Sequence, residues 1–359
     1  MLLLFLGCAP TPDSADAPEP VDYAAAGTFG ASRHTWELTD APTVRTFSAE
    51  VWAPAAEVPA VEPIANLLTD PGQFATYNLL LSSAPERCPS LTSTAGLDAD
   101  PADGGPWPLV MMSHCHGCTR FSTATVAAHL ATRGFVVVAP DHVGDTLFDT
   151  LDGGTLPLDE ATLALRKADL ETTLDTALAG ELGLAVDPDR VGVFGHSFGA
   201  VTAGIVLQDR LDTAGAPIAA MFVGAPPENP ILPGVEAARL DAPVLFLRLL
   251  EDHSVGAVGN MLMDANFQDV PGPAWELDLA DAGHWSPSDL VGLTEDFMPG
   301  CGTDSRESNG ADFTYLDAAR GRTLTSATAA AFFDLTLNGV EAGGDWLAAP
   351  SSEFMVTTK

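Results

Sequence analysis

Short apolar runs alternate with amphipathic stretches over the central and C-terminal parts of the chain. Residues 109–112 are apolar without interruption, as expected of a parallel strand buried on both faces of a sheet. Similar runs predict further strands at residues 135–139, 190–194, 217–223, 243–249 and 275–279. The helical period predicts helices at residues 125–133, 163–180, 198–208, 258–269 and 326–337. This alternation predicts a doubly wound, mostly parallel sheet with helices on both faces, and active residues on loops beyond the carboxyl ends of the strands.

The region before these elements has a different pattern. Alternating apolar and polar residues at 31–38 and 44–52 predict an antiparallel hairpin at an edge of the sheet. Residues 55–106 are rich in Pro, Ala, Asp and Gly and have no clear period, so we expect a loop with one short helix near residues 71–81. Together these patterns predict one domain over residues 28–345, followed by a C-terminal tail at 346–359.

The N-terminal segment resembles a bacterial lipoprotein signal. Apolar residues 2–6 lead to Gly7 and Cys8, although no basic residue precedes them and Phe5 stands where Leu is usual. We therefore expect residues 1–8 to be a signal segment with Cys8 lipidated, and Pro-, Asp- and Ala-rich residues 9–27 to be a disordered tether. The predicted location is outside the cytoplasm, lipid-anchored to the envelope or secreted. The alternative is an apolar N-terminal tail with an incidental cysteine.

Composition excludes several classes of protein. The 359 residues include 15 Lys and Arg against 49 Asp and Glu, a net charge of −34. Nucleic-acid binding requires clustered basic side chains, so it is not expected. Because 46% of the residues are hydrophobic, the chain has enough apolar surface to fold. Its acidic residues must lie mostly on the surface, which favours solubility and disfavours anionic substrates.

Four cysteines follow Cys8, at positions 88, 115, 118 and 301. One or two disulfides are expected in an exported chain, and the sequence does not choose among the three complete pairings. Cys115 and Cys118 have the spacing of a c-type haem site, but Thr119 stands where that site requires histidine. A metal site built from His114, Cys115, His116 and Cys118 is disfavoured, because adjacent side chains on an extended segment point to opposite faces. We expect no metal and no cofactor.

The strongest chemical signal is the pentapeptide Gly195-His196-Ser197-Phe198-Gly199. It follows a predicted strand and begins a predicted helix, which is the context of a nucleophile elbow. Glycines are needed at its two ends, because strand and helix cross there too closely for a Cβ. Ser197 is therefore the candidate nucleophile. The alternative is a glycine-rich turn with an incidental serine.

A serine nucleophile requires a base and an acid that orients the base. The chain order of this kind of site is serine, acid, histidine, with each partner after a strand. His284 is the candidate base, and the alternative is that His284 is a surface histidine. Asp252 is the candidate acid, with Glu251 as its rival, while Asp281 lies too close to His284 in the same loop.

An acyl-transfer site also requires backbone N–H donors for the oxyanion. Phe198, at the start of the helix, is expected to supply one. The second is expected from the loop after strand 109–112, at the N–H of Cys118. Trp285 and Phe198 are candidates for the floor of a substrate pocket or for simple packing. Residues 55–106 and 285–325 are expected to rim the pocket.

In combination, these segments resemble bacterial α/β-hydrolases known as predicted dienelactone hydrolases. The resemblance rests on residues 113–118, 139–146, 166–170, 195–199, 251–255 and 282–284 and covers residues 28–340. The group is similar to plasma-type platelet-activating-factor acetylhydrolases and, more distantly, to cutinase-like polyester hydrolases. The resemblance implies an α/β-hydrolase fold and a carboxylic ester hydrolase with Ser197, Asp252 and His284 as triad, and it favours Asp252 over Glu251. True dienelactone hydrolases have a cysteine nucleophile, so no dienelactone substrate is implied.

The same resemblance places His142 and the pair Arg166 and Asp169 beside the site. We expect His142 to be a hydrogen-bonded loop residue, and the Arg166/Asp169 pair to make a weak surface or interhelix contact. The predicted function is hydrolysis of neutral short or medium acyl esters, small or polymeric, by a monomeric enzyme. Amide hydrolysis or acyl transfer on the same triad is the alternative within the fold, and a catalytically idle, lipid-anchored binding domain is the alternative outside it.

Overall fold

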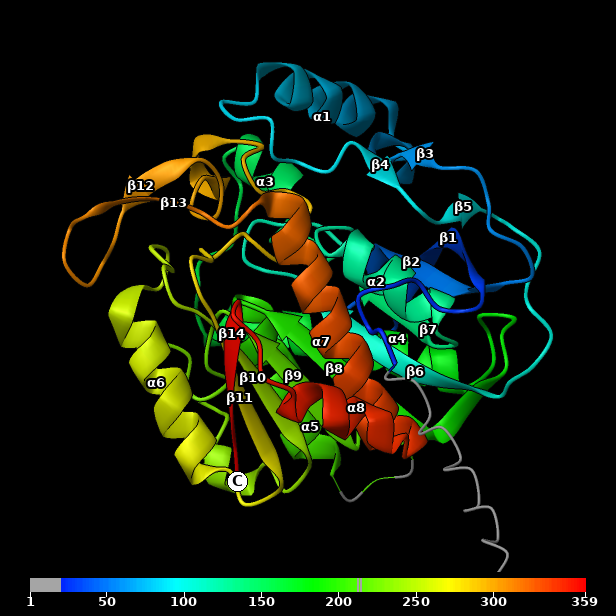
Figure 1. The fold of residues 1–359 in the computed structure, drawn as a ribbon. Helices are drawn as coiled ribbons and strands as arrows, with labels where there is room; N and C mark the ends of the chain where they lie inside the picture. Colours follow the sequence, from blue (N-terminus) through cyan, green and yellow to red (C-terminus); the bar gives the residue numbers. More distant parts are fainter. Residues whose placement is uncertain (1–20, 212, 214) are drawn as a thin grey trace, which may run out of the picture.

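The computed structural model describes residues 21–211, 213 and 215–359, and its centre is a ten-stranded sheet (Figure 1). The strand order is β14-β11-β10-β9-β8-β6-β7-β2-β1-β5. All neighbours from β7 to β11 in this order are parallel, whereas β2 and β14 join the sheet antiparallel. The predicted doubly wound, mostly parallel sheet is confirmed. The predicted lipidation at Cys8 and the signal segment lie outside the described residues.

The elements have the following bounds. The strands are β1 Gly30–Asp40, β2 Arg45–Ala55, β3 Glu62–Pro63, β4 Thr92–Ser93, β5 Gly96–Leu97, β6 Trp107–Ser113, β7 Val136–Pro140, β8 Val186–His196, β9 Ala219–Val223, β10 Val244–Leu249, β11 Ala274–Leu279, β12 Thr303–Ser305, β13 Asp312–Thr314 and β14 Phe354–Thr358. The α-helices are α1 Pro71–Ser83, α2 Ala124–Thr132, α3 Leu147–Leu151, α4 Glu160–Leu178, α5 Phe198–Arg210, α6 Gly256–Asp269, α7 Ala318–Asn338 and α8 Glu341–Ala348.

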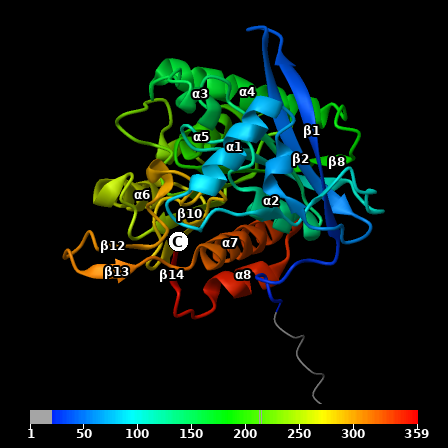
Figure 2. The same ribbon diagram turned by 90° about the horizontal axis from the view of Figure 1, so that it is seen from above.

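Helices cover both faces of the sheet, as the apolar runs predicted. Side chains alternate between the faces along each strand. In β6, Val110 and Met112 belong to the core between the sheet and helices α2 and α7, whereas Leu109 and Met111 belong to the core between the sheet and helices α4, α5 and α6. Figure 2 shows α7 and α8 on one side of the sheet and α4 and α5 on the other. Each central strand is therefore buried on both faces, which explains its continuous apolar sequence.

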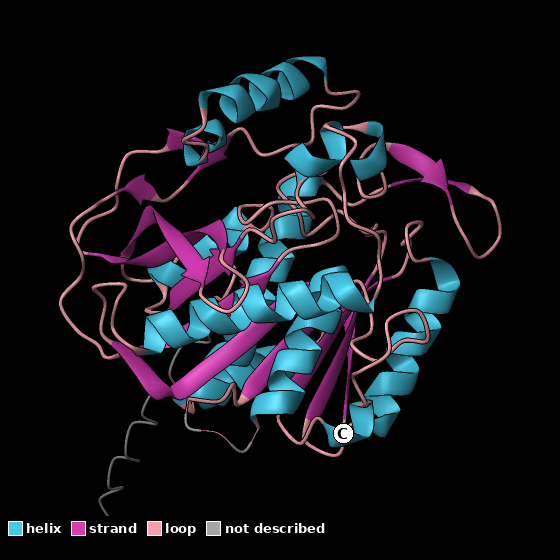
Figure 3. Cartoon of the chain, turned by 180° about the vertical axis from the view of Figure 1, so that it is seen from behind, coloured by secondary structure: helices cyan, strands magenta, loops and turns pink. Residues whose placement is uncertain are grey.

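The predicted N-terminal hairpin is confirmed as β1 and β2, paired from Gly30 opposite Ala55 to Asp40 opposite Arg45. It lies near the edge of the sheet, where only the two-residue strand β5 follows β1. The predicted helix near residues 71–81 is α1, and Asp70 caps its first turn by accepting from Gln73 N–H. Figures 1 and 3 show α1 and the β12–β13 hairpin at the same end of the molecule.

The C-terminal segment is not a tail, contrary to our expectation for residues 346–359. Helix α8 ends within it, and β14 pairs antiparallel with β11 as the last strand of the sheet. Leu347 is fully buried, and the rings of Trp346 and Phe354 pack 5.3 Å apart. A strand of five residues carries too weak a pattern to be recognised alone, and its stability depends on the exposed edge of β11.

The predicted disordered tether, residues 9–27, includes residues at its C-terminal end that belong to the folded domain. Tyr23 is fully buried, with its ring beneath the Arg133 guanidinium at 4.7 Å and 6.2 Å from the Trp346 ring. Gly27 N–H donates to Thr132 Oγ1 at 2.9 Å. Residues 21–27 therefore belong to the folded domain, because the Tyr23 ring packs against residues at the end of α2 and in α8, which lie far away in the sequence.

Two disulfides are present, Cys88–Cys301 and Cys115–Cys118. The first joins the segment after α1 to the segment before β12, and the second lies within the loop after β6. The thiols of the disfavoured metal site are thus bonded to each other. Among the residues the structure describes, no helix has the length and apolar character required to cross a membrane.

Candidate active site

Ser197 lies at a sharp turn between β8 and α5. Its backbone has φ 57° and ψ −122°, a conformation that side-chain-bearing residues rarely adopt. A Cβ on Gly195 would lie 2.1 Å from Gly199 O, and one on Gly199 would lie 2.0 Å from Ser113 O. The two glycines are required where strand, helix and the end of β6 cross. The local geometry is that of the predicted nucleophile elbow.

Asp252 and His284 form a buried pair beyond the ends of β10 and β11. Asp252 Oδ2 lies 2.6 Å from His284 Nδ1, and both side chains are almost inaccessible to solvent. The other carboxylate oxygen, Oδ1, accepts from the N–H groups of Ser254 and Val255 at 3.0 and 3.1 Å. These bonds hold the carboxylate so that it orients the imidazole.

Glu251, the rival acid, lies elsewhere. Its carboxylate accepts from Arg306 Nη1 at 2.7 Å and from Glu307 N–H at 3.2 Å, and both donors belong to the segment of the β12–β13 hairpin. The structure therefore brings Asp252, and not Glu251, against His284.

His284 lies beside the turn that carries Ser197. The rings of His196 and His284 are 5.0 Å apart, and His196 Nε2 lies 2.8 Å from the His284 carbonyl oxygen. Ser197 N–H donates to Val223 O at 2.9 Å, and a Cβ on the next residue, Gly224, would lie 3.5 Å from His284 Nδ1. Among the residues that the structure describes, no hydrogen bond joins Ser197 Oγ to the His284 ring. Such bonds are often long before substrate binds.

A cavity of about 360 Å³ opens at Ser197 and Phe198. Most of its other lining residues are apolar and come from residues 225–232 after β9 and from the start of α6. The expectation that residues 55–106 and 285–325 rim the pocket is wrong, since none of them lines this cavity. Prolines and other apolar residues of segment 225–232 form much of the wall instead. Their role was not visible in the sequence, because they belong to no regular element.

Trp285 does not line this cavity, so of the two alternatives left open for it, pocket floor or simple packing, the structure favours packing. It is buried and packs at right angles against the rings of His284, at 4.8 Å, and Phe297, at 4.6 Å. Trp285 thus supports the His284 imidazole by packing against it in the protein interior. Phe198 does line the cavity.

The loop after β6 places Cys118 away from the cavity. Cys118 is fully buried and forms a parallel bridge with Thr146, in which its carbonyl accepts from Leu147 N–H at 2.7 Å. His116, two residues earlier, lines the cavity together with Ser197. Sequence reasoning missed His116, because the position of each residue in the loop depends on the Cys115–Cys118 disulfide.

Residues 95–271 match the family model described as Dienelactone hydrolase family. The match covers just under half of the chain and is consistent with the expected resemblance to dienelactone hydrolase-like proteins. It includes Ser197 and Asp252 and ends before His284. The structure is similar to that of a ferulic acid esterase from Streptomyces cinnamoneus, with a TM-score of 0.69 and 24% sequence identity over 93% of this chain and 98% of that chain. That likeness shows a common α/β-hydrolase fold, and no curated protein matches the chain.

The match to this hydrolase family supports an ester-hydrolysing enzyme. Three further histidines surround the site of this α/β-hydrolase and stay neutral. Burial lowers the pKa of His114 to about 4 and that of His196 to about 3, and it lowers the pKa of His142 well below its ordinary value. They act as neutral hydrogen-bonding groups. His142 contacts Ser113 Oγ and Asp169, which confirms its expected role as a hydrogen-bonded loop residue.

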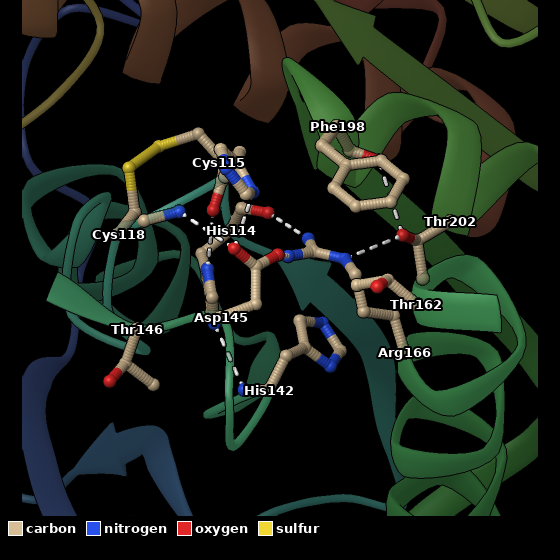
Figure 4. A network of polar contacts seen from close by, with 12 residues as sticks. His114, Cys115, Cys118, His142, Asp145, Thr146, Thr162, Arg166, Phe198 and Thr202 are labelled. Atoms are coloured by element: carbon tan, nitrogen blue, oxygen red, sulfur yellow. Dashed lines mark hydrogen bonds and ion pairs between the residues drawn. A yellow bond between two sulfur atoms is a disulfide. The ribbon is translucent and has the colours of Figure 1, made fainter. Parts of the chain in front are cut away.

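Arg166 and Asp169 do not form the weak surface contact expected from their sequence spacing. Both side chains of this α/β-hydrolase are fully buried, and each bonds to other partners. Asp169 pairs with Arg45 at 2.9 Å and with His142 at 3.1 Å. Arg166 pairs with Asp145 and joins the network in Figure 4. The spacing of three residues wrongly predicted a surface pair, because this face of α4 packs against loops at the end of the sheet and not against solvent.

Proposed function

We propose that this protein is a serine carboxylic ester hydrolase with Ser197 as nucleophile, His284 as base and Asp252 as acid. The observation that carries the proposal is the strained Ser197 at the start of α5, next to a buried Asp252–His284 pair 2.6 Å apart. Backbone strain of this kind persists where the surrounding structure requires it, typically at functional sites. The proposal agrees with the match of residues 95–271 to a hydrolase family model.

The proposed reaction proceeds through an acyl-enzyme. Ser197 Oγ attacks the ester carbonyl while His284 Nε2 takes its proton and passes it to the leaving alcohol. Water then attacks the acyl-enzyme with His284 again as base. Asp252 keeps the imidazole in the required tautomer and stabilises the imidazolium.

Two backbone donors are proposed for the oxyanion. One is Phe198 N–H, which lies at the first position of α5 and gains from the helix dipole. The second comes from the loop after β6, which we expected at Cys118. His116 N–H is the better candidate, since His116 lines the cavity with Ser197, whereas Cys118 is fully buried and bridges to Thr146.

The proposed substrate is a neutral ester with a small or medium apolar group. A cavity of about 360 Å³ is at the small end of the range for ligand sites, and its walls are mostly apolar. The net charge of −34 disfavours anionic esters by repulsion at low salt. The similar fold of a ferulic acid esterase adds aromatic acyl groups to the substrates that should be compared.

The test is labelling with a fluorophosphonate probe, together with hydrolysis of p-nitrophenyl esters. The wild-type protein should be labelled and should hydrolyse the esters, whereas Ser197→Ala should do neither. Ser254→Ala is a matched control, because Ser254 also lines the cavity but has no proposed role in the chemistry. Labelling that persists in Ser197→Ala would refute the assignment.

We further propose that the protein is exported and carries a lipid on Cys8. Two disulfides support export, because disulfides persist in oxidising compartments. Mass spectrometry of the mature N-terminus tests the lipid directly. An unmodified Met1, or cleavage at another residue, would refute it.

A further inference from the structure

We infer that Arg166 is a positioning residue that holds the two sides of the oxyanion site in a fixed relation to each other. The inference rests on the proposed function and adds a residue to it. Arg166 lies in α4, outside the loops that carry the triad, and its side chain is only 1% exposed. Figure 4 shows its guanidinium between the loop after β6 and the first turn of α5.

On one side, Arg166 holds the loop that contains His116. Its Nη2 donates to the His114 carbonyl oxygen and to Ser113 Oγ, and its Nη1 donates to Asp145 Oδ2. Asp145 extends this connection, because its Oδ1 accepts from Gly117 N–H at 2.9 Å and lies 2.5 Å from His116 Nδ1. Arg166 and Asp145 therefore contact the loop at residues 113 and 114, before the Cys115–Cys118 disulfide, and at residues 116 and 117, between its two cysteines.

On the other side, Arg166 holds the start of α5. Its Nε donates to Thr202 Oγ1 at 3.1 Å, and Thr202 Oγ1 in turn donates to the Phe198 carbonyl oxygen at 3.1 Å. The guanidinium carbon lies 4.4 Å from the centre of the Phe198 ring. The same side chain thus contacts the residue that supplies the first proposed oxyanion donor.

The chemistry of the side chain suits this role. The guanidinium is planar and bonds in several fixed directions, whereas the lysine ammonium is a compact charge without that geometry. Burial would raise the pKa of Asp145, but the charge of Arg166 and a hydrogen bond with His116 hold that pKa below its ordinary value. The ion pair therefore persists. Oxyanion donors are effective only when they are held in place before the reaction, so a rigid connection between them acts on the transition state.

Arg166→Lys tests the inference. It keeps a positive charge for Asp145 and removes the simultaneous bonds to both sides. We expect kcat for a p-nitrophenyl ester to fall at least tenfold with KM changed by less than threefold. The affinity for a boronic acid, which forms a tetrahedral adduct with the serine, should fall by a similar factor.

Arg33→Lys is the matched control. Arg33 is also 1% exposed and pairs with the carboxylates of Glu50 and Glu62, but on the β1 side of the sheet. The Arg33→Lys variant shows how replacing a buried arginine by lysine changes the stability of the protein. If Arg166→Lys is folded and loses no more kcat than Arg33→Lys, or if KM rises while kcat is kept, the inference is wrong.

Thr202→Val decides the question if Arg166→Lys does not fold. This substitution preserves shape and removes the hydrogen bonds that run from Arg166 Nε through Thr202 Oγ1 to the Phe198 carbonyl, while the contact of the guanidinium with the Phe198 ring stays. It should lower kcat several-fold at unchanged KM, and a wild-type kcat would overturn the inference. Failure of the proposed function would look different, because the wild-type protein itself would then show neither ester hydrolysis nor labelling of Ser197.

Discussion

Glu251 and Arg306 form a salt bridge of 2.7 Å, although Glu251 is the residue directly before Asp252. Arg306 also pairs with Asp281 at 2.6 Å, and Asp281 lies three residues before His284. One arginine of the β12–β13 segment thus contacts both the loop of the candidate acid and the loop of the candidate base. The Cys88–Cys301 disulfide attaches the start of this segment to the body of the domain.

The first prediction separates the two adjacent carboxylates. Asp252→Asn should lower kcat by roughly 10³- to 10⁴-fold, because the imidazole loses its orienting charge. Glu251→Gln should lower kcat less than tenfold, because Glu251 contacts Arg306 instead of His284. Steady-state kinetics on one p-nitrophenyl ester measures both variants. Comparable losses in the two variants would contradict the assignment of Asp252.

The second prediction concerns Arg306 itself. Arg306→Gln should lower kcat about threefold to tenfold with little change in thermal stability, since partly exposed ion pairs contribute little to folding. The loss reflects looser loops around Asp252 and His284. Arg239→Gln is the control, because Arg239 makes an exposed ion pair with Glu236 away from these loops. Equal kcat in the two variants would show that Arg306 has no positioning role.

The third prediction concerns the cavity. Val258 lines it and is 62% exposed, so Val258→Trp should fill part of the space without unfolding the protein. The ratio of kcat/KM for an octanoyl ester to that for an acetyl ester should fall about tenfold, as expected when a few methylene groups lose their apolar contacts. Val58→Trp, at an even more exposed position that does not line the cavity, is the control. An unchanged ratio would place the acyl group elsewhere.

The fourth prediction concerns stability in acid. Burial, followed by the charge of Arg133, lowers the pKa of His129 to about 4, from about 6.5 in the unfolded chain. The unfolded chain therefore binds a proton that the folded chain does not. The resulting stability is complete above pH 6.5 and is lost as the pH falls toward 4.

Between pH 7.5 and pH 4.5, the wild-type protein should lose on the order of 2 kcal/mol more unfolding free energy than His129→Gln. Urea denaturation at the two pH values measures this difference. His129 lies in α2, away from the triad, so the ester hydrolysis of the variant at pH 7.5 should match that of the wild type. Parallel loss of stability in both proteins would contradict a lowered pKa.

Some boundaries and contacts could not be predicted because they depend on distant residues. Helix α7 begins at Ala318, eight residues before the predicted start, since its polar first turns pack on the loop that contains Ser286. The walls of the cavity come from residues 225–232, which have no periodic pattern. Arg166 and Asp169 suggested an exposed helical pair, and only the packing of α4 against the strand ends shows them to be buried.

The sequence by itself determined the sheet, the helices on its two faces and the elbow at Ser197, because apolar periodicity and the glycines at 195 and 199 act over a few neighbouring residues. Only the tertiary structure decided which carboxylate faces His284, how the four cysteines pair, and that Tyr23 and β14 belong to the domain. Those outcomes depend on contacts between segments that are distant along the chain, such as Cys88 with Cys301. Local sequence patterns carry no information about which distant surfaces meet.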